Sequence, residues 1–198
     1  MSDDGRIFRN TDMYEYTHQI DKAGYHSVII KRHKYLVHRL VAQAFINDYD
    51  EQKDVHHIDE DKAIMLSNDQ FAAKNPFEYQ KADRLVYCNI LEHLLLHVKI
   101  AEEPRSADAN QGELPGVGGA VTMICRQIND YFNGYNFKQD YMVAAMKLIE
   151  DSYDEYIRIL KHLWTVIEGN PLYSQLIKKE DLAKGWDGKV IDKILVEL

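Results

Sequence analysis

Hydrophobic and polar positions change their period several times along the chain, and each change predicts a different element. Near the N-terminus, short β-branched and aromatic runs alternate with polar turns: "GRIFR" (5–9), "YEYTH" (14–18) and "YHSVII" (25–30). Such runs are typical of short β-strands. In "KYLVHRLVAQAFI" (34–46), apolar residues recur at steps of three and four, which predicts a helix. This part of the chain is therefore predicted to be β-rich with one short helix.

The next apolar runs predict two strands followed by a helix. "VHHID" (55–59) and "RLVYC" (84–88) are strand-like, and a polar insertion (60–83) separates them. "NILEHLLLHVKIAEE" (89–103) predicts a helix, with Asn89 as the N-cap. Its predicted buried stripe consists of Leu91, Leu94, Leu95 and Val98.

The last part of the chain is predicted to be helical. Gly, Pro, Ser and Asn are frequent in residues 104–119, which indicates a linker. A helix is predicted over 120–132, a long helix over 139–169, and further helical segments follow. The packing stripe of the long helix is expected to contain Met142, Met146, Ile149, Tyr153, Ile157 and Leu160.

Together these patterns predict an α+β protein with three parts. Residues 1–50 form a small β-rich segment with a short helix. Residues 51–104 form a strand–strand–helix core, and residues 118–198 form a helical domain. A length of 198 residues is sufficient for a sizeable core.

Composition narrows the class of protein. The apolar fraction of 45% and the charged fraction of 28% are ordinary for a folded soluble protein. The polar, acidic start does not resemble a secretory signal, and no apolar run approaches the roughly 18 residues that would span a bilayer. Cys88 and Cys125 do not form a CxxC pair. We therefore expect no disulfide framework, no membrane partner and a cytoplasmic location.

The charge distribution leaves room for a local basic patch. The net charge is −8, but residues 1–50 are neutral overall. The densest basic run contains Lys31, Arg32, Lys34 and Arg39. These side chains could follow a phosphate backbone, because electrostatic contact requires only a local patch. The alternative is a charged strand edge that prevents aggregation.

Four of the nine histidines occur in the strand–strand–helix core. His93 and His97 are four residues apart, so on a helix they point to the same side and could hold one metal ion. His56 and His57 are adjacent, and on a strand they point to opposite faces. One of this pair could join the metal ion while the other acts as a general base near neutral pH. The alternative is that the spacing is coincidental.

These segments also resemble a known family. "GYHSVIIKRHKYLVHRLVAQAFI" (24–46), followed by "DVHHIDEDK" (54–62), is similar to the HNH homing-type endonucleases of phages and mobile elements. "RLVYCNILEHLLLH" (84–97) is similar to the closing segment of that family. The resemblance spans about residues 5–100, and nothing after residue 104 takes part in it.

The resemblance implies a ββα-metal finger that hydrolyses phosphodiester bonds in DNA, most often double-stranded. By position, His57 matches the general base, and His56, His93 and His97 match the ligands of one divalent ion (Mg²⁺, Mn²⁺, Ni²⁺ or Zn²⁺). Asp54 stands where related colicin-type nucleases have an acid close to the metal site.

One departure from the family bears on activity. Asp83 and Arg84 stand where the motif has an asparagine that fixes the loop carrying the base. Either Asp83 substitutes for it or the site is weakened. Three functions therefore stay open: an active endonuclease, a catalytically degenerate protein on the same scaffold that binds nucleic acid or protein, and a helical interaction protein. The acidic helical part is expected to act as a scaffold, a partner surface or a homodimer interface.

Overall fold

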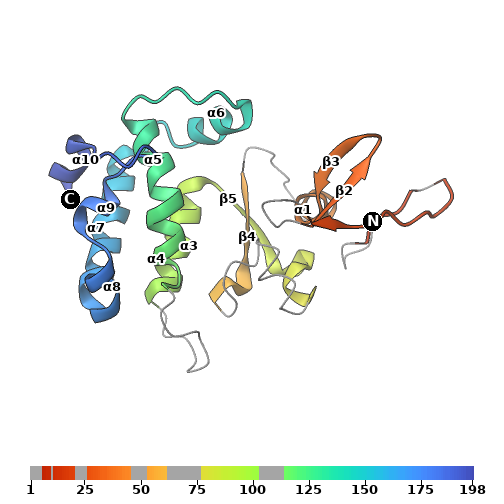
Figure 1. Cartoon of the computed structure of the whole chain (residues 1–198), viewed down its shortest axis with the longest axis horizontal. Helices are drawn as coiled ribbons and strands as arrows, with labels where there is room; N and C mark the ends of the chain where they lie inside the picture. Colours follow the sequence, from red (N-terminus) through yellow and green to blue (C-terminus); the bar gives the residue numbers. More distant parts are fainter. Residues whose placement is uncertain (1–5, 10, 21–25, 46–52, 62–76, 103–113) are drawn as a thin grey trace. The chain divides into compact units, whose positions relative to one another are not determined.

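The computed structural model contains both helices and strands, which confirms the mixed α and β composition (Figure 1). It describes residues 6–9, 11–20, 26–45, 53–61, 77–102 and 114–198. Residues 62–76 of the insertion predicted over 60–83, and residues 104–113 of the linker predicted over 104–119, lie outside the described residues. The chain divides into two compact units, of which the first comprises residues 1–51 and 55–87 and the second comprises residues 52–54 and 88–198. The three-part division expected from the sequence stays a prediction.

The first unit contains a three-stranded antiparallel sheet in the order β1-β2-β3. The strands are β1 (Gln19–Ile20), β2 (His26–Ile30) and β3 (His33–Leu36). The predicted strand at 25–30 is thus confirmed. The strand predicted at 14–18 is wrong, because Glu15 makes only one isolated bridge, to Phe8. The segment contains two tyrosines and one threonine, which favour strands, but it is too short for these residues to extend the single bridge into a ladder.

Helix α1 (Val37–Phe45) follows β3 directly and confirms the helix predicted from the three- and four-residue period. Its Val37 and Val41 are buried together with Val28 of β2, and Ile7 and Leu85 complete this small core. The four-residue spacing of Val37 and Val41 places both side chains on one face of α1, which explains why that face packs on the sheet.

Two further strands, β4 (Asp54–His57) and β5 (Leu85–Cys88), form a separate two-stranded sheet. Short 3₁₀ turns adjoin them at η1 (Ile58–Asp61), η2 (Phe77–Gln80) and η3 (Ala82–Arg84). After β5, only Asn89 precedes helix α3 (Ile90–Glu102). The strand, strand and helix predicted from the sequence are therefore present and follow one another as expected.

Asn89 caps α3, as predicted. Its Oδ1 accepts hydrogen bonds from the backbone N–H groups of Leu91 (2.9 Å) and Glu92 (3.0 Å). The Glu92 carboxylate accepts the Asn89 N–H in return at 2.7 Å, which completes a capping box. Of the predicted buried stripe, Leu91, Leu94 and Val98 are buried, but Leu95 is 51% exposed, so that part of the prediction is wrong.

The C-terminal residues are helical, as expected. The helices in the described part are α4 (Val117–Gly119), the π-helical segment η4 (Ala120–Ile124), α5 (Cys125–Phe132), α6 (Asp140–Lys147), α7 (Tyr153–Gly169), α8 (Pro171–Leu176), α9 (Lys179–Leu182) and α10 (Asp192–Glu197). The single long helix predicted over 139–169 is wrong, since α6 and α7 are separate. The break covers residues 148–152 and includes Asp151 and Ser152, since Asp and Ser favour turns and helix starts over helix interiors.

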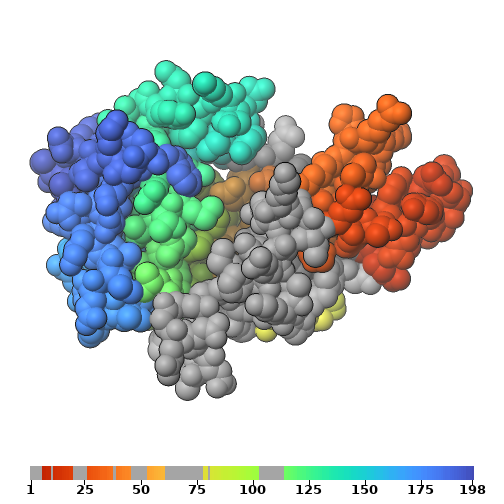
Figure 2. All heavy atoms as spheres, in the orientation of Figure 1, coloured from red at the N-terminus to blue at the C-terminus, as the bar shows by residue number. Residues whose placement is uncertain are grey.

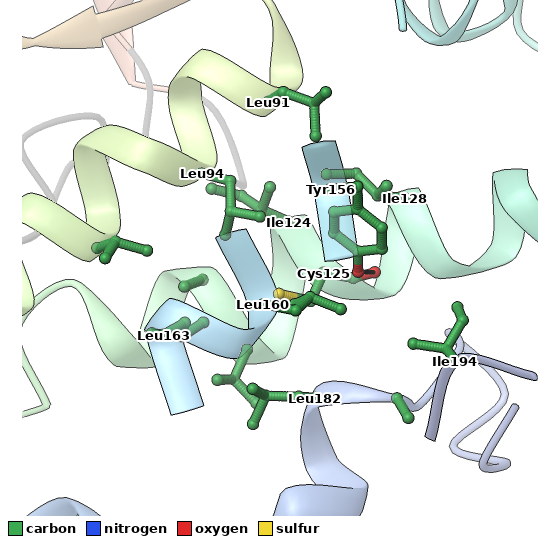
Figure 3. Packing of buried hydrophobic residues seen from close by; sticks show 14 of the residues in the cluster. Leu91, Leu94, Ile124, Cys125, Ile128, Tyr156, Leu160, Leu163, Leu182 and Ile194 are labelled. Atoms are coloured by element: carbon green, nitrogen blue, oxygen red, sulfur yellow. Dashed lines mark hydrogen bonds between the residues drawn. The ribbon is translucent and has the colours of Figure 1, made fainter. Parts of the chain in front are cut away.

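The second unit is built around one hydrophobic core, in which α3, α5 and α7 meet (Figure 3). Leu94, Ile128, Leu160 and Leu163 are fully buried there. The predicted stripe is largely confirmed, because Met146, Ile149, Ile157 and Leu160 are all buried. Burial of each such side chain contributes roughly 1.5–3 kcal/mol to folding.

Candidate metal centre

The two helix histidines lie side by side on α3. The ring centroids of His93 and His97 are 5.0 Å apart. The four-residue spacing produces this arrangement, since residues i and i+4 occupy the same face of a helix. Both side chains are partly buried. One ion could therefore contact both imidazoles.

Asp54 holds the first of these imidazoles. Nδ1 of His93 lies 3.2 Å from Oδ2 of Asp54, the first residue of β4. A carboxylate in this position favours the tautomer in which Nδ1 carries the proton and donates it. The lone pair is then on Nε2, which is the usual arrangement of a metal-binding histidine with a carboxylate behind it. Asp54 thus contacts His93, and its predicted role beside a metal ion stays a prediction.

Gly116 holds the second imidazole in the same way. Nδ1 of His97 lies 3.0 Å from the backbone carbonyl oxygen of Gly116, so the same tautomer is favoured. Burial, together with the neighbouring His93, lowers the pKa of His97 to about 4, although the hydrogen bond to Gly116 opposes the shift. His97 is therefore neutral at pH 7, and the neutral imidazole is the form that binds metal ions.

His56 is the third ligand that the sequence predicts. It belongs to the first compact unit, whereas His93 and His97 belong to the second, so a shared site of the three stays a prediction. Imidazole ligands suit Zn²⁺, Ni²⁺ and related ions.

Both histidines of β4 are buried, with exposed fractions of 3% for His56 and 1% for His57. Nδ1 of His56 lies 3.4 Å from Oε2 of Glu60, so a carboxylate stands near this imidazole as well. The two roles predicted for this adjacent pair, metal ligand for His56 and general base for His57, stay a prediction.

Arg84 contacts the segment that follows His57. Its Nη1 lies 3.5 Å from Oδ2 of Asp59, whose side chain is only 1% exposed. Asp83, by contrast, is mostly exposed and lies 3.7 Å from the Nε of Arg84. Of Asp83 and Arg84, Arg84 is therefore the one that contacts the turn after His57.

The predicted nucleic-acid contacts are placed on or near the β2–β3 hairpin. Lys31 and Arg32 form its two-residue turn, and they are exposed together with Lys34, whereas Arg39 on α1 is half-buried. The hairpin is visible on the face drawn in Figure 2 (orange). Lys31 and Arg32 have positive φ angles of 50° and 69°, as a type I′ turn requires. Asn and Gly adopt these angles more readily, so two cationic residues here are unusual.

Sequence reasoning overlooked two groups that contact the candidate ligands. Glu60 stands four residues after His56, a spacing that could have revealed it. The Gly116 carbonyl gave no comparable indication, because a backbone oxygen has no sequence signature. Cys88 is buried, and burial raises the pKa of its thiol to about 12, so it stays protonated.

Comparison of the chain with protein-family models, with curated proteins and with solved structures gives no match. The likeness to HNH endonucleases therefore rests on the quoted sequence segments and stays a prediction. In the part of the chain that the structure describes, every helix is too short or too polar to traverse a lipid bilayer.

Proposed function

We propose that this protein is a metal-dependent endonuclease of the HNH type that hydrolyses phosphodiester bonds in DNA. The observation that carries the proposal is the pair of imidazoles of His93 and His97, whose ring centroids are 5.0 Å apart and whose Nδ1 atoms lie against Asp54 and the Gly116 carbonyl. The same strand–strand–helix segment also contains His56 and His57, which the sequence resemblance matches to a third ligand and to the general base. This combination supports a site that binds a metal ion and moves a proton.

Each residue has a distinct role in the proposed reaction. His57 accepts a proton from the water that attacks the phosphorus, a contribution worth roughly 10²–10⁴ in rate. His56, His93 and His97 hold the divalent ion, which when bound stabilises negative charge on the phosphate and the leaving oxygen. Asp54 orients His93 through the 3.2 Å contact.

Arg84 contributes indirectly by holding Asp59, two residues after the base. Lys31, Arg32 and Lys34 bind the phosphate backbone, for which their exposure and charge are suited. DNA binding by an acidic protein then depends on this hairpin and on salt concentration.

Plasmid cleavage tests the proposal directly. Purified wild-type protein is incubated with supercoiled DNA and Mg²⁺, Mn²⁺, Ni²⁺ or Zn²⁺, with EDTA as the control. The His57→Ala variant, purified in parallel, guards against a contaminating nuclease. We expect metal-dependent nicking or linearisation by the wild type and a loss of at least about 10²-fold in the variant. Equal cleavage by both proteins, or none by either, contradicts the proposal.

A second function is favoured by two observations at the same site. His57 is only 1% exposed, and Arg84 replaces the family asparagine. A catalytically degenerate scaffold that binds nucleic acid or a protein partner would have these features. Metal binding and DNA binding without cleavage would distinguish this scaffold protein from the active enzyme. Absence of metal binding would favour the helical interaction protein.

A further inference from the structure

We infer that Gly116 and Gly119 position the His97 imidazole for metal binding, so that the start of the C-terminal helical region is part of the metal centre. This inference rests on the proposed metal site. It extends that site beyond residue 104, where the sequence resemblance ends. Both glycines and His97 lie in the same compact unit.

Gly116 brings its carbonyl group to His97 by a close approach of two backbones. A Cβ at this position would lie 2.1 Å from the carbonyl oxygen of His97 and 2.8 Å from the amide nitrogen of Ala101. Its φ angle of 72° also favours glycine. Only glycine therefore allows the chain to lie against the last turns of α3 and to present an acceptor to Nδ1 of His97 at 3.0 Å.

Gly119 provides the space for the imidazole ring. A Cβ here would lie 2.6 Å from Cε1 and 3.0 Å from Nδ1 of His97. The backbone of Gly119 has ordinary helical angles, φ −63° and ψ −43°, which any residue adopts. The backbone conformation at position 119 thus does not require glycine. Glycine is needed there because a Cβ would collide with the His97 ring. Gly118 differs, because its Cβ would meet only Leu114 at 3.9 Å.

The hydrophobic core holds these glycines in place. Directly after Gly119, the π-helical segment η4 buries Ala120, Val121 and Ile124, and it packs against α3. Leu94 and Val98 of α3 belong to the same core. Short π-helical segments within helices occur frequently at functional sites. The imidazole of His97 is therefore fixed by packing that depends on the C-terminal helices.

A buried histidine could have a hydrogen bond for structural reasons alone, but the neighbouring histidine argues otherwise. His93 has the same arrangement, with Asp54 at its Nδ1. Two adjacent imidazoles thus both favour a proton on Nδ1 and a lone pair on Nε2. Binding of one ion through Nε2 of both residues needs this shared tautomer, whereas packing stability does not.

The test compares two neighbouring substitutions, Gly119→Ala and Gly118→Ala, in the full-length protein. Titration calorimetry with Zn²⁺ and absorption spectra with Co²⁺ report metal affinity and ligand geometry. We expect Gly119→Ala to weaken binding by about 10–100-fold and to change the Co²⁺ spectrum. Gly118→Ala should bind within about twofold of wild type, since its new methyl group meets only an ordinary contact.

Two further measurements separate positioning from loss of folding. Circular dichroism and thermal melting should show that both variants fold, because the helix propensity of alanine opposes the cost of moving the His97 ring in Gly119→Ala. Long-range ¹H–¹⁵N NMR spectra should show the proton of His97 on Nδ1 in the wild type and in Gly118→Ala, and an altered pattern in Gly119→Ala.

Equal metal affinity in the wild type and Gly119→Ala overturns the inference and leaves the proposed function standing. So does a loss of affinity that merely follows a loss of folding, or an equal loss in both variants. A wild type that binds metal without cutting DNA overturns only the nuclease activity. A wild type that binds no metal overturns both proposals.

Discussion

The carboxylate of Asp54 lies 3.2 Å from Nδ1 of His93, although 39 residues separate them in the chain. The contact joins the start of β4 to the first turn of α3. In a metal site, such a carboxylate orients the ligand and increases its basicity, and its removal typically costs 10–100-fold in affinity.

Substitution of Asp54 should therefore weaken metal binding without unfolding the protein. We expect Asp54→Ala to lose about 10–100-fold in Zn²⁺ affinity by calorimetry. Asp54→Asn should lose less, because its amide oxygen can still accept the Nδ1 proton. The exposed Asp83→Ala variant is the matched control, with unchanged affinity. Equal affinities for Asp54→Ala and wild type would show that Asp54 has no part in the site.

The Asp59–Arg84 pair should stabilise the first unit. Arg84→Ala leaves the carboxylate of Asp59, 1% exposed, without its 3.5 Å ion-pair partner. Because Arg84 is itself 39% exposed, solvent screening reduces the cost to about 1–2 kcal/mol of unfolding free energy. Urea denaturation of both single variants and of the double variant with Asp59→Asn measures the coupling. Additive effects would mean that the pair contributes nothing.

Removal of the Asn89 cap should destabilise α3. Asn89→Ala removes the acceptor for the N–H groups of Leu91 and Glu92 and should cost about 0.5–2 kcal/mol. Asn89→Asp preserves the acceptor and should be close to wild type. Chemical denaturation followed by circular dichroism gives both values. An Asn89→Ala variant as stable as the wild type would contradict the role of the cap.

The buried hydrogen bonds of Asn129 should matter more than that of Tyr156. Asn129 donates to the carbonyl groups of Leu182 (2.8 Å) and Lys184 (2.9 Å) and accepts the Tyr156 hydroxyl proton. Tyr156→Phe removes the hydroxyl that donates to Asn129 and, at 3.3 Å, to the Cys125 carbonyl, and it should cost about 1–2 kcal/mol. Asn129→Ala removes the donor to two carbonyls and leaves the Tyr156 hydroxyl only its longer contact with Cys125, so its cost should exceed that of Tyr156→Phe. Denaturant unfolding should show this order; the reverse order would contradict it.

The hairpin turn offers a test in which stability and DNA affinity change in opposite directions. Lys31→Asn combined with Arg32→Gly places the residues favoured in type I′ turns at the two positive φ angles. Unfolding free energy should rise by about 1 kcal/mol through relief of backbone strain.

DNA affinity of the same variant should fall, and the slope of log K against log salt should decrease by about 1.8, the value for two phosphate contacts. Fluorescence anisotropy at several salt concentrations measures both quantities. Lys147→Asn with Lys161→Asn removes the same charge from exposed positions on α6 and α7 and is the control. An equal change in DNA affinity and salt dependence in the control would mean that the effect arises from net charge rather than from the hairpin.

Local sequence patterns determined several helices of this protein, one helix cap and the shared face of two histidines. The period of apolar residues predicted α1 and α3, the side-chain chemistry of Asn89 predicted the cap, and the spacing of His93 and His97 predicted a shared face. Each of these depends on interactions within about four residues, which the sequence displays directly.

The remaining features were decided by tertiary structure. The exposure of Leu95 and the division between α6 and α7 depend on which neighbours cover each surface. The contact of Gly116 with His97 joins residues 19 apart through a backbone carbonyl, which has no identity that a sequence could reveal. Helical periodicity aligned His97 with His93, but only the packing of the C-terminal helices brought an acceptor to its ring.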